Sequence, residues 1–377
     1  MTLSRAELVQ LHRDLVRTPS VSGEEGDAIA LAAGFLESHG LAVERIGGSA
    51  FAWAGAPVGS DLPFVLFDSH LDTVPVCPGW TRAPFAADLE GERIFGLGAN
   101  DAKAAVAAMI ASAIALPHAA RGELTLGLAL VRDEERRSAG TEEIVAELAR
   151  RGLAPAAVVV GEPTRLDIAI AQKGLLVLEL VAKGEAAHAA HARTLGARNA
   201  VTELARDLLA IEALLAGPSG PVDRLLGAAT VEPTMLSGGT ARNVVPAEAR
   251  AVLDCRTVPN EPPQALRARL AGVVAGEVVV LSERLRPVAT DAAAGLVLCA
   301  RRARPEARLY GSATLSDMTF FAGRQAIKVG PGESARSHRP DEFVTVDELA
   351  AGAAFYGRLL EELAIAGIAA SAVEARA

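Results

Sequence analysis

The sequence is poor in aromatic residues, in cysteine and in positive charge. Aromatic side chains make up 4% of its 377 residues, and the formal net charge is −9. This charge argues against a nucleic-acid-binding protein, because such binding depends on contacts between basic side chains and phosphates. The three cysteines, Cys77, Cys255 and Cys299, lie far apart, so neither a disulfide framework nor a thiolate zinc site is expected.

The sequence also lacks a long uninterrupted apolar stretch. About 20 such residues are needed to cross a bilayer, so no membrane partner is expected. The first residues, Met-Thr-Leu-Ser-Arg-Ala-Glu, have no apolar core after a basic start, unlike a secretory signal. Together with thiols that look reduced, this predicts a cytoplasmic protein.

The length of the chain predicts two domains, because one ordinary core does not extend over 377 residues. In the first part, apolar patterns of helical and strand type alternate. Helices are expected at residues 4–17, 24–39, 101–116 and 141–151, and strands at 43–45, 51–54, 62–67, 123–131 and 156–160. This alternation is typical of an α/β sheet with right-handed crossovers.

The pattern changes after Gly174. Strands are expected at 175–182, 228–236, 247–256 and 278–281, with helices at 199–216 and 262–275. The alternation then resumes with helices at 292–303, 317–322 and 346–363 and a strand at 326–329. The sequence therefore predicts an α/β domain with a mostly parallel central sheet, residues 1–175 and 286–377, and an inserted α+β domain, residues 176–285.

His70 and Asp72 stand two residues apart, directly after the apolar run 62–67. The run predicts a buried strand, and an α/β protein presents its ligands where such strands end. An imidazole binds a metal through one ring nitrogen, and a carboxylate can orient the ring through the other. The pair suits a metal site, although His-x-Asp alone is common by chance.

More acidic or histidine residues occupy similar places: Asp101 after the glycine-rich turn 96–100, Glu134 and Glu135 after the strand 123–131, Glu162 after 156–160, and His338 after 326–329. If the sheet is parallel, all these loops lie at its carboxyl edge. Two histidines and several carboxylates without thiolates suit zinc, cobalt or manganese. Their number fits two metals that share one carboxylate better than a single metal.

Glu134 and Glu135 are adjacent, so both cannot easily point the same way. We expect one to bind metal and the other to act as a general base toward a bridging water. Metal coordination lowers the pKa of such a water toward neutrality. The sequence therefore predicts metal-assisted hydrolysis, with an amide as the substrate bond.

The motifs at residues 69–75, 96–103, 133–135, 161–164 and 330–338 resemble those of the dinuclear-zinc aminoacylase and carboxypeptidase metallohydrolases. They occur in the family's order and span nearly the whole chain. The resemblance implies a zinc-peptidase-like catalytic domain, and it makes residues 176–285 a lid domain through which two subunits form a homodimer. It also implies a cis peptide bond after Asp101.

The resemblance further implies a role for each residue of the site. One of two zinc ions, replaceable by cobalt or manganese, would be held by His70, Asp101 and Glu162, and the other by Asp101, Glu135 and His338. Glu134 would be the general base, and Asp72 would orient His70.

Three lid residues also resemble functional residues of the family. His188 matches the residue that reaches a neighbouring subunit's site and stabilises the oxyanion. His191 is the alternative, since the family's proline near this position is Ala192 here. Asn243 and Arg256 match groups that bind the substrate carboxylate, and the planar fork of an arginine suits that task.

The expected reaction is hydrolysis of an N-acyl amino acid. The run 70–103 is most similar to the members that convert N-acetylornithine to ornithine and acetate in arginine biosynthesis, or act on N-acetylcitrulline. The alternatives are a succinyl-diaminopimelate desuccinylase, a lysine-pathway deacetylase, and a dipeptidase or carboxypeptidase. A non-catalytic binding protein on the same fold is a further hypothesis.

Overall fold

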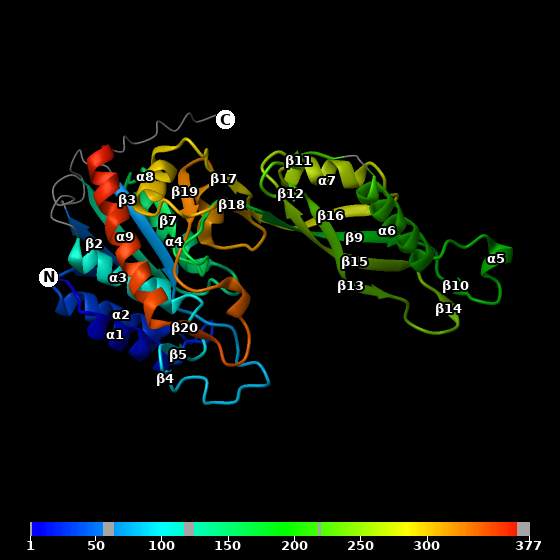
Figure 1. Ribbon diagram of the computed structural model, residues 1–377. Helices are drawn as coiled ribbons and strands as arrows, with labels where there is room; N and C mark the ends of the chain where they lie inside the picture. The colour runs from blue at the N-terminus through cyan, green and yellow to red at the C-terminus, as the bar shows by residue number, and fades with distance from the viewer. Residues whose placement is uncertain (1, 56–63, 117–123, 218–219, 368–377) are drawn as a thin grey trace. The chain divides into compact units, whose positions relative to one another are not determined.

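The computed structural model describes residues 2–55, 64–116, 124–217 and 220–367, which form two compact units (Figure 1). The first unit comprises Met1–Ile170, Ala289–Tyr310 and Ser316–Ala377. The second comprises Ala171–Val288 and Gly311–Leu315. Residues 176–285, predicted as the lid, all lie within the second unit.

A mixed sheet forms the core of the first unit, in the order β1-β2-β6-β3-β7-β19-β8-β17, with β18 paired to β8. Its strands are β1 (Ala42–Ile46), β2 (Ser49–Gly55), β3 (Phe64–His70), β6 (Thr125–Val131), β7 (Ala157–Val160), β8 (Ile168–Gln172), β17 (Val288–Ala289), β18 (Leu309–Ser312) and β19 (Gln325–Lys328). The central strands β6, β3, β7 and β19 run parallel, whereas β1, β2 and β8 pair antiparallel. The parallel strands are buried along their length, which explains their continuous apolar runs.

Helices cover this sheet (Figure 1). They are α1 (Arg5–Arg17), α2 (Gly26–Ser38), α3 (Lys103–Ala115), α4 (Ala139–Arg150), α8 (Gly295–Ala303) and α9 (Val346–Ala366), with the 3₁₀ turns η1 (Asp317–Phe321) and η2 (Ser334–Arg336). Helix α3 packs against α1, α9 and the sheet, and it is buried nearly all round, as its apolar sequence predicted. Three short strands, β4 (Asp88–Glu90), β5 (Arg93–Phe95) and β20 (Phe343–Thr345), form a small separate sheet.

The second unit is built on an antiparallel sheet in the order β13-β15-β9-β16. Its strands are β9 (Gly174–Lys183), β13 (Thr230–Gly238), β15 (Glu248–Thr257) and β16 (Glu277–Leu285), and its helices are α5 (Ala192–Leu195), α6 (Ala200–Ala216) and α7 (Pro263–Ala271). Short strand pairs link β10 (Ala187–His188) to β14 (Val244–Val245) and β11 (Val222–Asp223) to β12 (Gly227–Ala228). Buried and half-buried residues alternate along β15, because α6 and α7 pack on the sheet.

The structure differs from the predicted elements in several places. Strand β8 was not predicted, although all five of its residues are buried. The helix expected at 262–275 ends at Ala271, and the one expected at 317–322 is a single 3₁₀ turn. The starts of two predicted strands, residues 62–63 and 123, lie outside the described residues. Within the part of the chain that is described, no helix combines the length and apolarity needed to span a membrane.

Candidate metal centre

The parallel strands bring most of the predicted residues to one edge of the sheet. His70 is the last residue of β3, while Glu134 and Glu135 follow β6 and Glu162 follows β7. His338 lies in the loop between η2 and β20, after β19. The strands that precede these residues are parallel, so their carboxyl ends meet as expected.

Asp101 reaches the same place by a different route. It precedes α3 and does not follow a strand of the central sheet. Its peptide bond to Ala102 is cis, as the resemblance implied.

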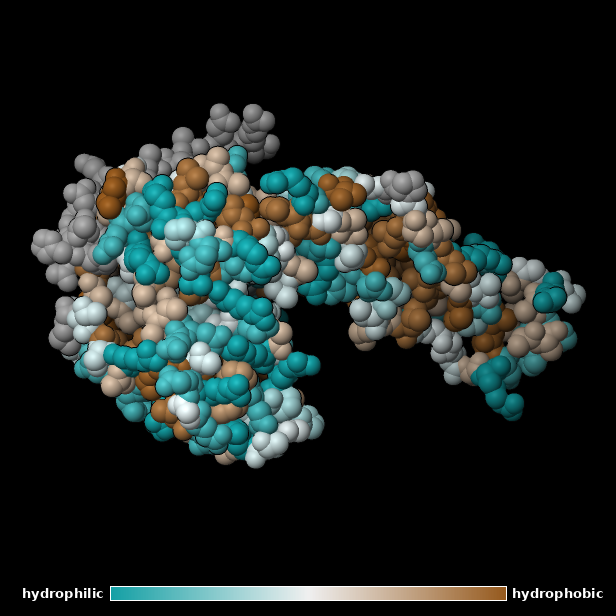
Figure 2. Space-filling model, in the orientation of Figure 1, coloured by the Kyte–Doolittle hydropathy of each residue, from teal (hydrophilic) through white to brown (hydrophobic). Residues whose placement is uncertain are grey.

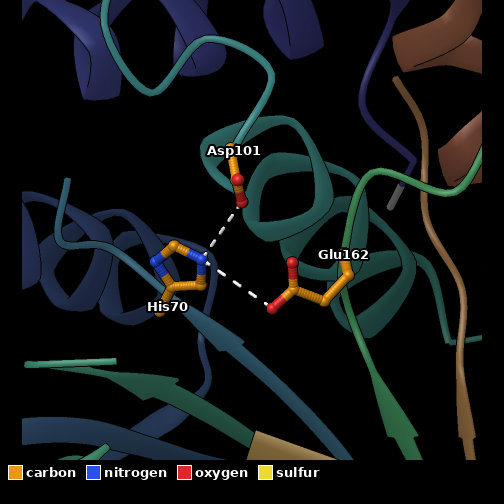
Figure 3. A group of neighbouring side chains, drawn as sticks. All are labelled: His70, Asp101 and Glu162. Carbon is orange, nitrogen blue, oxygen red and sulfur yellow. Dashed lines mark ion pairs between the residues drawn. The ribbon is translucent and has the colours of Figure 1, made fainter. Parts of the chain in front are cut away.

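Two groups of potential ligands share the Asp101 carboxylate. In one, His70 Nε2 lies 3.3 Å from Asp101 Oδ1 and 3.9 Å from Glu162 Oε1 (Figure 3). In the other, His338 Nε2 lies 2.9 Å from Glu135 Oε1 and 3.8 Å from Asp101 Oδ2. Within each group the ligand atoms lie within 4.8 Å of one another. Asp101 thus offers one oxygen to each group, which is the geometry of a bridging ligand.

Asp72 contacts both His70 and the loop that follows β6. The Nδ1 atom of His70 lies 3.0 Å from the backbone carbonyl of Asp72 and 3.5 Å from its carboxylate. The carboxylate accepts the backbone N–H groups of Glu134 at 3.0 Å and Glu135 at 3.1 Å, and the hydroxyl of Ser22 at 2.6 Å. Asp72 therefore holds the Glu134–Glu135 loop as well as the His70 ring.

Buried charge is concentrated in these groups. Burial raises the pKa of Glu134 well above its ordinary value, and the nearby carboxylate of Glu162 raises it further. Burial and the Asp101 carboxylate raise the pKa of Glu162 to about 8. The hydrogen bond to Glu135 raises the pKa of His338 to about 9. A cation bound among these carboxylates would relieve their mutual repulsion.

The donor atoms fit two divalent cations. A carbonyl oxygen can only accept, so His70 Nδ1 carries the proton that it donates to Asp72, and Nε2 is the atom that would bind a cation. Asp101 Oδ1, which lies 3.3 Å from this Nε2, is buried and has no hydrogen-bond partner among the described residues. Imidazole nitrogens with carboxylate oxygens are ligands that zinc accepts, and the backbone contact fixes the ring tautomer.

Three supporting residues were not assigned a role from the sequence. Asn100 and Glu342 are buried and hydrogen-bond the loop around Asp101. The Nζ of Lys103 donates to the carbonyls of Leu15 at 2.8 Å and Thr18 at 3.0 Å, at the end of α1. A lone charge that opens an otherwise apolar helix was a signal for Lys103, whereas Glu342 stands in an acidic stretch that looks like an ordinary surface turn.

The predicted lid residues occupy two places in the second unit. His188 lies on β10, and the backbone N–H of the next residue, Ala189, donates to the carbonyl of Asn243 at 2.9 Å. His188 and Asn243 are therefore neighbours. The N–H of Ala190 donates to His188 Nδ1 at 3.2 Å, which leaves the ring proton on Nε2. The ring of His191 lies 5.7 Å from that of His188.

Arg256 lies on β15, near the end of the four-stranded sheet that is farther from β10 and β14. Glu248 of β15 pairs with Lys183 of β9, whereas Arg256 pairs with Leu175. Roughly 27 Å of strand separates Glu248 from Arg256. The guanidinium of Arg256 donates to Asp254 Oδ1 at 2.7 Å and Oδ2 at 3.0 Å. The structure therefore brings His188 and Asn243 together and leaves Arg256 apart from them, paired with Asp254.

The chain is similar to known proteins over nearly its whole length. The model of peptidase family M20/M25/M40 matches residues 66–362. The chain is 32% identical over 386 residues to succinyl-diaminopimelate desuccinylase of Acidiphilium cryptum (strain JF-5), and the match covers 96% of this chain and 100% of that protein.

Two solved structures share the fold at lower identity. The M20 family metallo-carboxypeptidase Sso-CP2 of Sulfolobus solfataricus has a TM-score of 0.74 at 20% identity, over 95% of this chain and 99% of that one. The Bacillus subtilis YXEP protein, a dinuclear metal binding peptidase, has a TM-score of 0.71 at 18% identity, over 95% and 97% of the two chains. The predicted fold class, a mostly parallel central sheet with a separate lid-like antiparallel sheet, is confirmed.

Proposed function

The chain belongs to peptidase family M20/M25/M40 and is a metallohydrolase, and from this membership we propose that it hydrolyses the amide bond of an N-acyl amino acid. One observation carries the proposal: the two oxygens of Asp101 face two separate ligand groups beside the half-buried Glu134. A binding protein that has lost catalysis would not need both ligand groups and a carboxylate beside them.

The proposed mechanism assigns the proton transfers to Glu134. Cations held by the two ligand groups would supply Lewis-acid activation of the substrate carbonyl and would lower the pKa of the attacking water. Glu134, fixed through its backbone by Asp72, accepts a proton from the attacking water as the new C–O bond forms. It then passes this proton to the amine nitrogen as the C–N bond breaks. A pKa raised above the ordinary range of a carboxyl group suits a group that both accepts and donates a proton.

We further propose that the oxyanion is stabilised by His188. Its Nδ1 accepts the Ala190 N–H, so Nε2–H is free to donate to a developing negative charge. Arg256 is proposed to bind the substrate carboxylate, for which it must exchange its present partner Asp254. Asn243, adjacent to His188, is proposed to bind the substrate carboxylate as well.

The separation of His188 from Arg256 supports a homodimer. Both cannot easily serve one site from the same chain, because His188 lies on the separate β10–β14 pair that follows the Lys183 end of β9, whereas Arg256 pairs near the Gly174 end of that strand. A partner subunit that contributes His188 and Asn243 resolves this. The second unit also exposes hydrophobic residues over α6, as Figure 2 shows, and an unpaired apolar sheet edge favours pairing between copies.

The first substrate that we propose is N-succinyl-diaminopimelate. The full-length relative named for that substrate supports it better than the sequence alone supported N-acetylornithine. N-acetylornithine stays the second candidate, because the run 70–103 favoured it. Cytoplasmic localisation stays a prediction, and the three cysteines Cys77, Cys255 and Cys299 are all free thiols.

The experiment is amine release by the zinc-loaded and the cobalt-loaded protein across five substrates: N-succinyl-diaminopimelate, N-acetylornithine, N-acetylcitrulline, N-acetyllysine and a dipeptide. We expect the highest kcat/KM for the succinyl compound. Preference for an N-acetyl amino acid would keep the reaction class and replace the substrate. Cation binding without hydrolysis of any substrate would favour a non-catalytic binding protein.

A further inference from the structure

One buried carboxylate outside both ligand groups contacts the backbone of the bridging residue. Glu342 is 2% exposed and lies between His338 and β20. Its Oε1 accepts the N–H groups of Asn100 at 2.8 Å and Asp101 at 3.0 Å. The N–H of Gly98 also donates to this carboxylate. One side chain thus satisfies three backbone donors of the loop before α3.

Asn100 joins the same loop to the start of the segment that carries His338. Its Nδ2 donates to the Glu333 carbonyl at 3.1 Å and to Ser337 Oγ at 3.2 Å. Its Oδ1 accepts the Glu333 N–H at 2.8 Å. Together with Glu342, these bonds hold the His338 segment against the loop at both of its ends.

The His338 segment needs such support because its own conformation is unfavourable. His338 has φ +61° and Asp341 has φ +56°, a left-handed region that residues other than glycine adopt rarely. The His338 side chain is 53% exposed, so packing around it provides little restraint. The Asp341 carboxylate accepts the Thr81 N–H at 3.0 Å and hydroxyl at 2.7 Å, which adds one more anchor.

We propose that Glu342 is a positioning residue that sets Asp101 against His338 and thereby assembles the second ligand group, formed with Glu135. The inference rests on the two-cation site of the proposed function and goes beyond it, because Glu342 is neither a ligand nor the base. The first ligand group depends less on Glu342, since His70 and Glu162 stand at the ends of β3 and β7.

A purely structural role for Glu342 makes a different prediction. If Glu342 only stabilised the fold, its replacement would lower the stability of the whole chain without changing the ratio of affinities of the two cation sites. A proton-transfer role differs as well, because glutamine would then be as harmful as alanine. In a positioning role, Glu342→Gln is the milder change, since its carbonyl oxygen can still accept the Asn100 and Asp101 N–H groups.

The test is cobalt titration of the metal-free full chain, followed by visible absorption and calorimetry. We expect the wild-type protein to bind two equivalents. Glu342→Ala should weaken the affinity for the cobalt ion held by the second ligand group about ten- to hundredfold, as is usual for residues that support metal ligands. It should change the affinity of the first ligand group much less. Glu342→Gln should weaken the affinity of the second group by less than Glu342→Ala does.

The matched control is Asp207→Asn in the second unit. Asp207 is also a buried carboxylate that accepts two backbone N–H groups, from Ala275 at 2.8 Å and Gly276 at 2.9 Å. This variant should bind both equivalents like the wild type. Equal weakening of both equivalents in Glu342→Ala, or no weakening of either, would overturn the proposal.

Hydrogen exchange in the metal-free protein provides a second measurement. It remains possible if Glu342→Ala fails to fold, because it uses Glu342→Gln. The amides of residues 98–101 should exchange several-fold faster in Glu342→Gln than in the wild type, because a neutral carbonyl is a weaker acceptor than the carboxylate it replaces. Unchanged exchange would overturn the positioning role. A wild-type chain that binds no cobalt would contradict the proposed function itself. The exchange rates would still decide whether Glu342 orders the loop.

Discussion

At the scale of single residues, Asp72 connects His70, a proposed metal ligand, to the proposed base. The sequence predicted only that it orients His70. In the structure its carboxylate also accepts the N–H groups of Glu134 and Glu135. Two adjacent acids can therefore point in different directions, because their backbone is held from one side by a single buried carboxylate.

Glu134→Gln tests the division of roles between the two acids. Glutamine keeps the size of the side chain but cannot accept the water's proton, so kcat should fall at least about 10²- to 10⁴-fold. Bound zinc, measured by elemental analysis, should remain at the wild-type level. The control is Glu135→Gln, which removes a charged oxygen that lies 2.9 Å from His338 and should lower the zinc content. Loss of zinc from Glu134→Gln would contradict the role as base.

At the scale of elements, α1 supports the loop that carries Asp101. His12 of α1 is fully buried, and its Nε2 donates to the Ala99 carbonyl at 2.8 Å. Its Nδ1 is buried without a hydrogen-bond partner among the described residues. Burial lowers the pKa of His12 to about 4, although the bond to Ala99 opposes this shift. The helix therefore docks with a neutral imidazole.

This burial predicts a pH dependence of folding stability. Between pH 6.5 and about 4 the unfolded chain binds a proton at His12 and the folded chain does not. The contribution of His12 to stability is therefore lost as pH falls through this window, by about 1.4 kcal/mol per pH unit and about 3 kcal/mol in total. His12→Gln keeps an N–H donor but does not titrate, so its stability should fall less over the same range.

The measurement is urea unfolding of the metal-free wild type and His12→Gln at several pH values from 7 to 4. Metal-free protein is used so that release of cations by acid does not add to the result. Parallel pH dependence of the two proteins would show that His12 is not neutral in the folded state.

At the scale of the whole molecule, the two edges of the second unit's sheet differ. On β13, Met235 is 67% and Leu236 is 66% exposed, and nearly every residue of this edge strand faces solvent. Val201 and Leu209 of α6 are also exposed. Two exposed apolar side chains on an edge strand, beside exposed apolar side chains on a helix, form a surface that a second copy could cover.

Leu236→Lys should therefore weaken the dimer and lower activity while zinc content stays unchanged, because His188 would no longer reach a partner's site. The measurement is molar mass by light scattering, together with kcat. The matched control is Leu281→Lys on β16, the opposite edge, where a leucine that is 52% exposed should be replaceable without effect.

Mixing two inactive variants tests the same arrangement. Glu134→Gln supplies an intact His188, and His188→Ala supplies an intact Glu134. If His188 acts across the dimer, mixed dimers contain one complete site, and activity should return after the subunits exchange. Continued inactivity of verified mixed dimers would place His188 in its own chain's site.

Much of the candidate site could be predicted from sequence because its residues follow local signals. His70 ends β3, and Glu134 and Glu162 closely follow β6 and β7. Apolar runs predicted these parallel strands, and such strands share one edge whatever the rest of the chain does. The identities of these residues also restrict the chemistry, since imidazoles and carboxylates without thiolates favour zinc-like cations.

Tertiary structure alone decided how these residues are held. Glu342 hydrogen-bonds Asn100 and Asp101 across more than 240 positions of sequence, and no periodicity marks such a pair. The same holds for Asp72 and Glu134, and for the separation of the β10–β14 pair, which carries His188, from the end of β15 that carries Arg256. Local patterns report burial and the ends of elements. Hydrogen bonds between distant loops arise only when the whole chain has packed, because each needs two separate backbones fixed within about 3 Å.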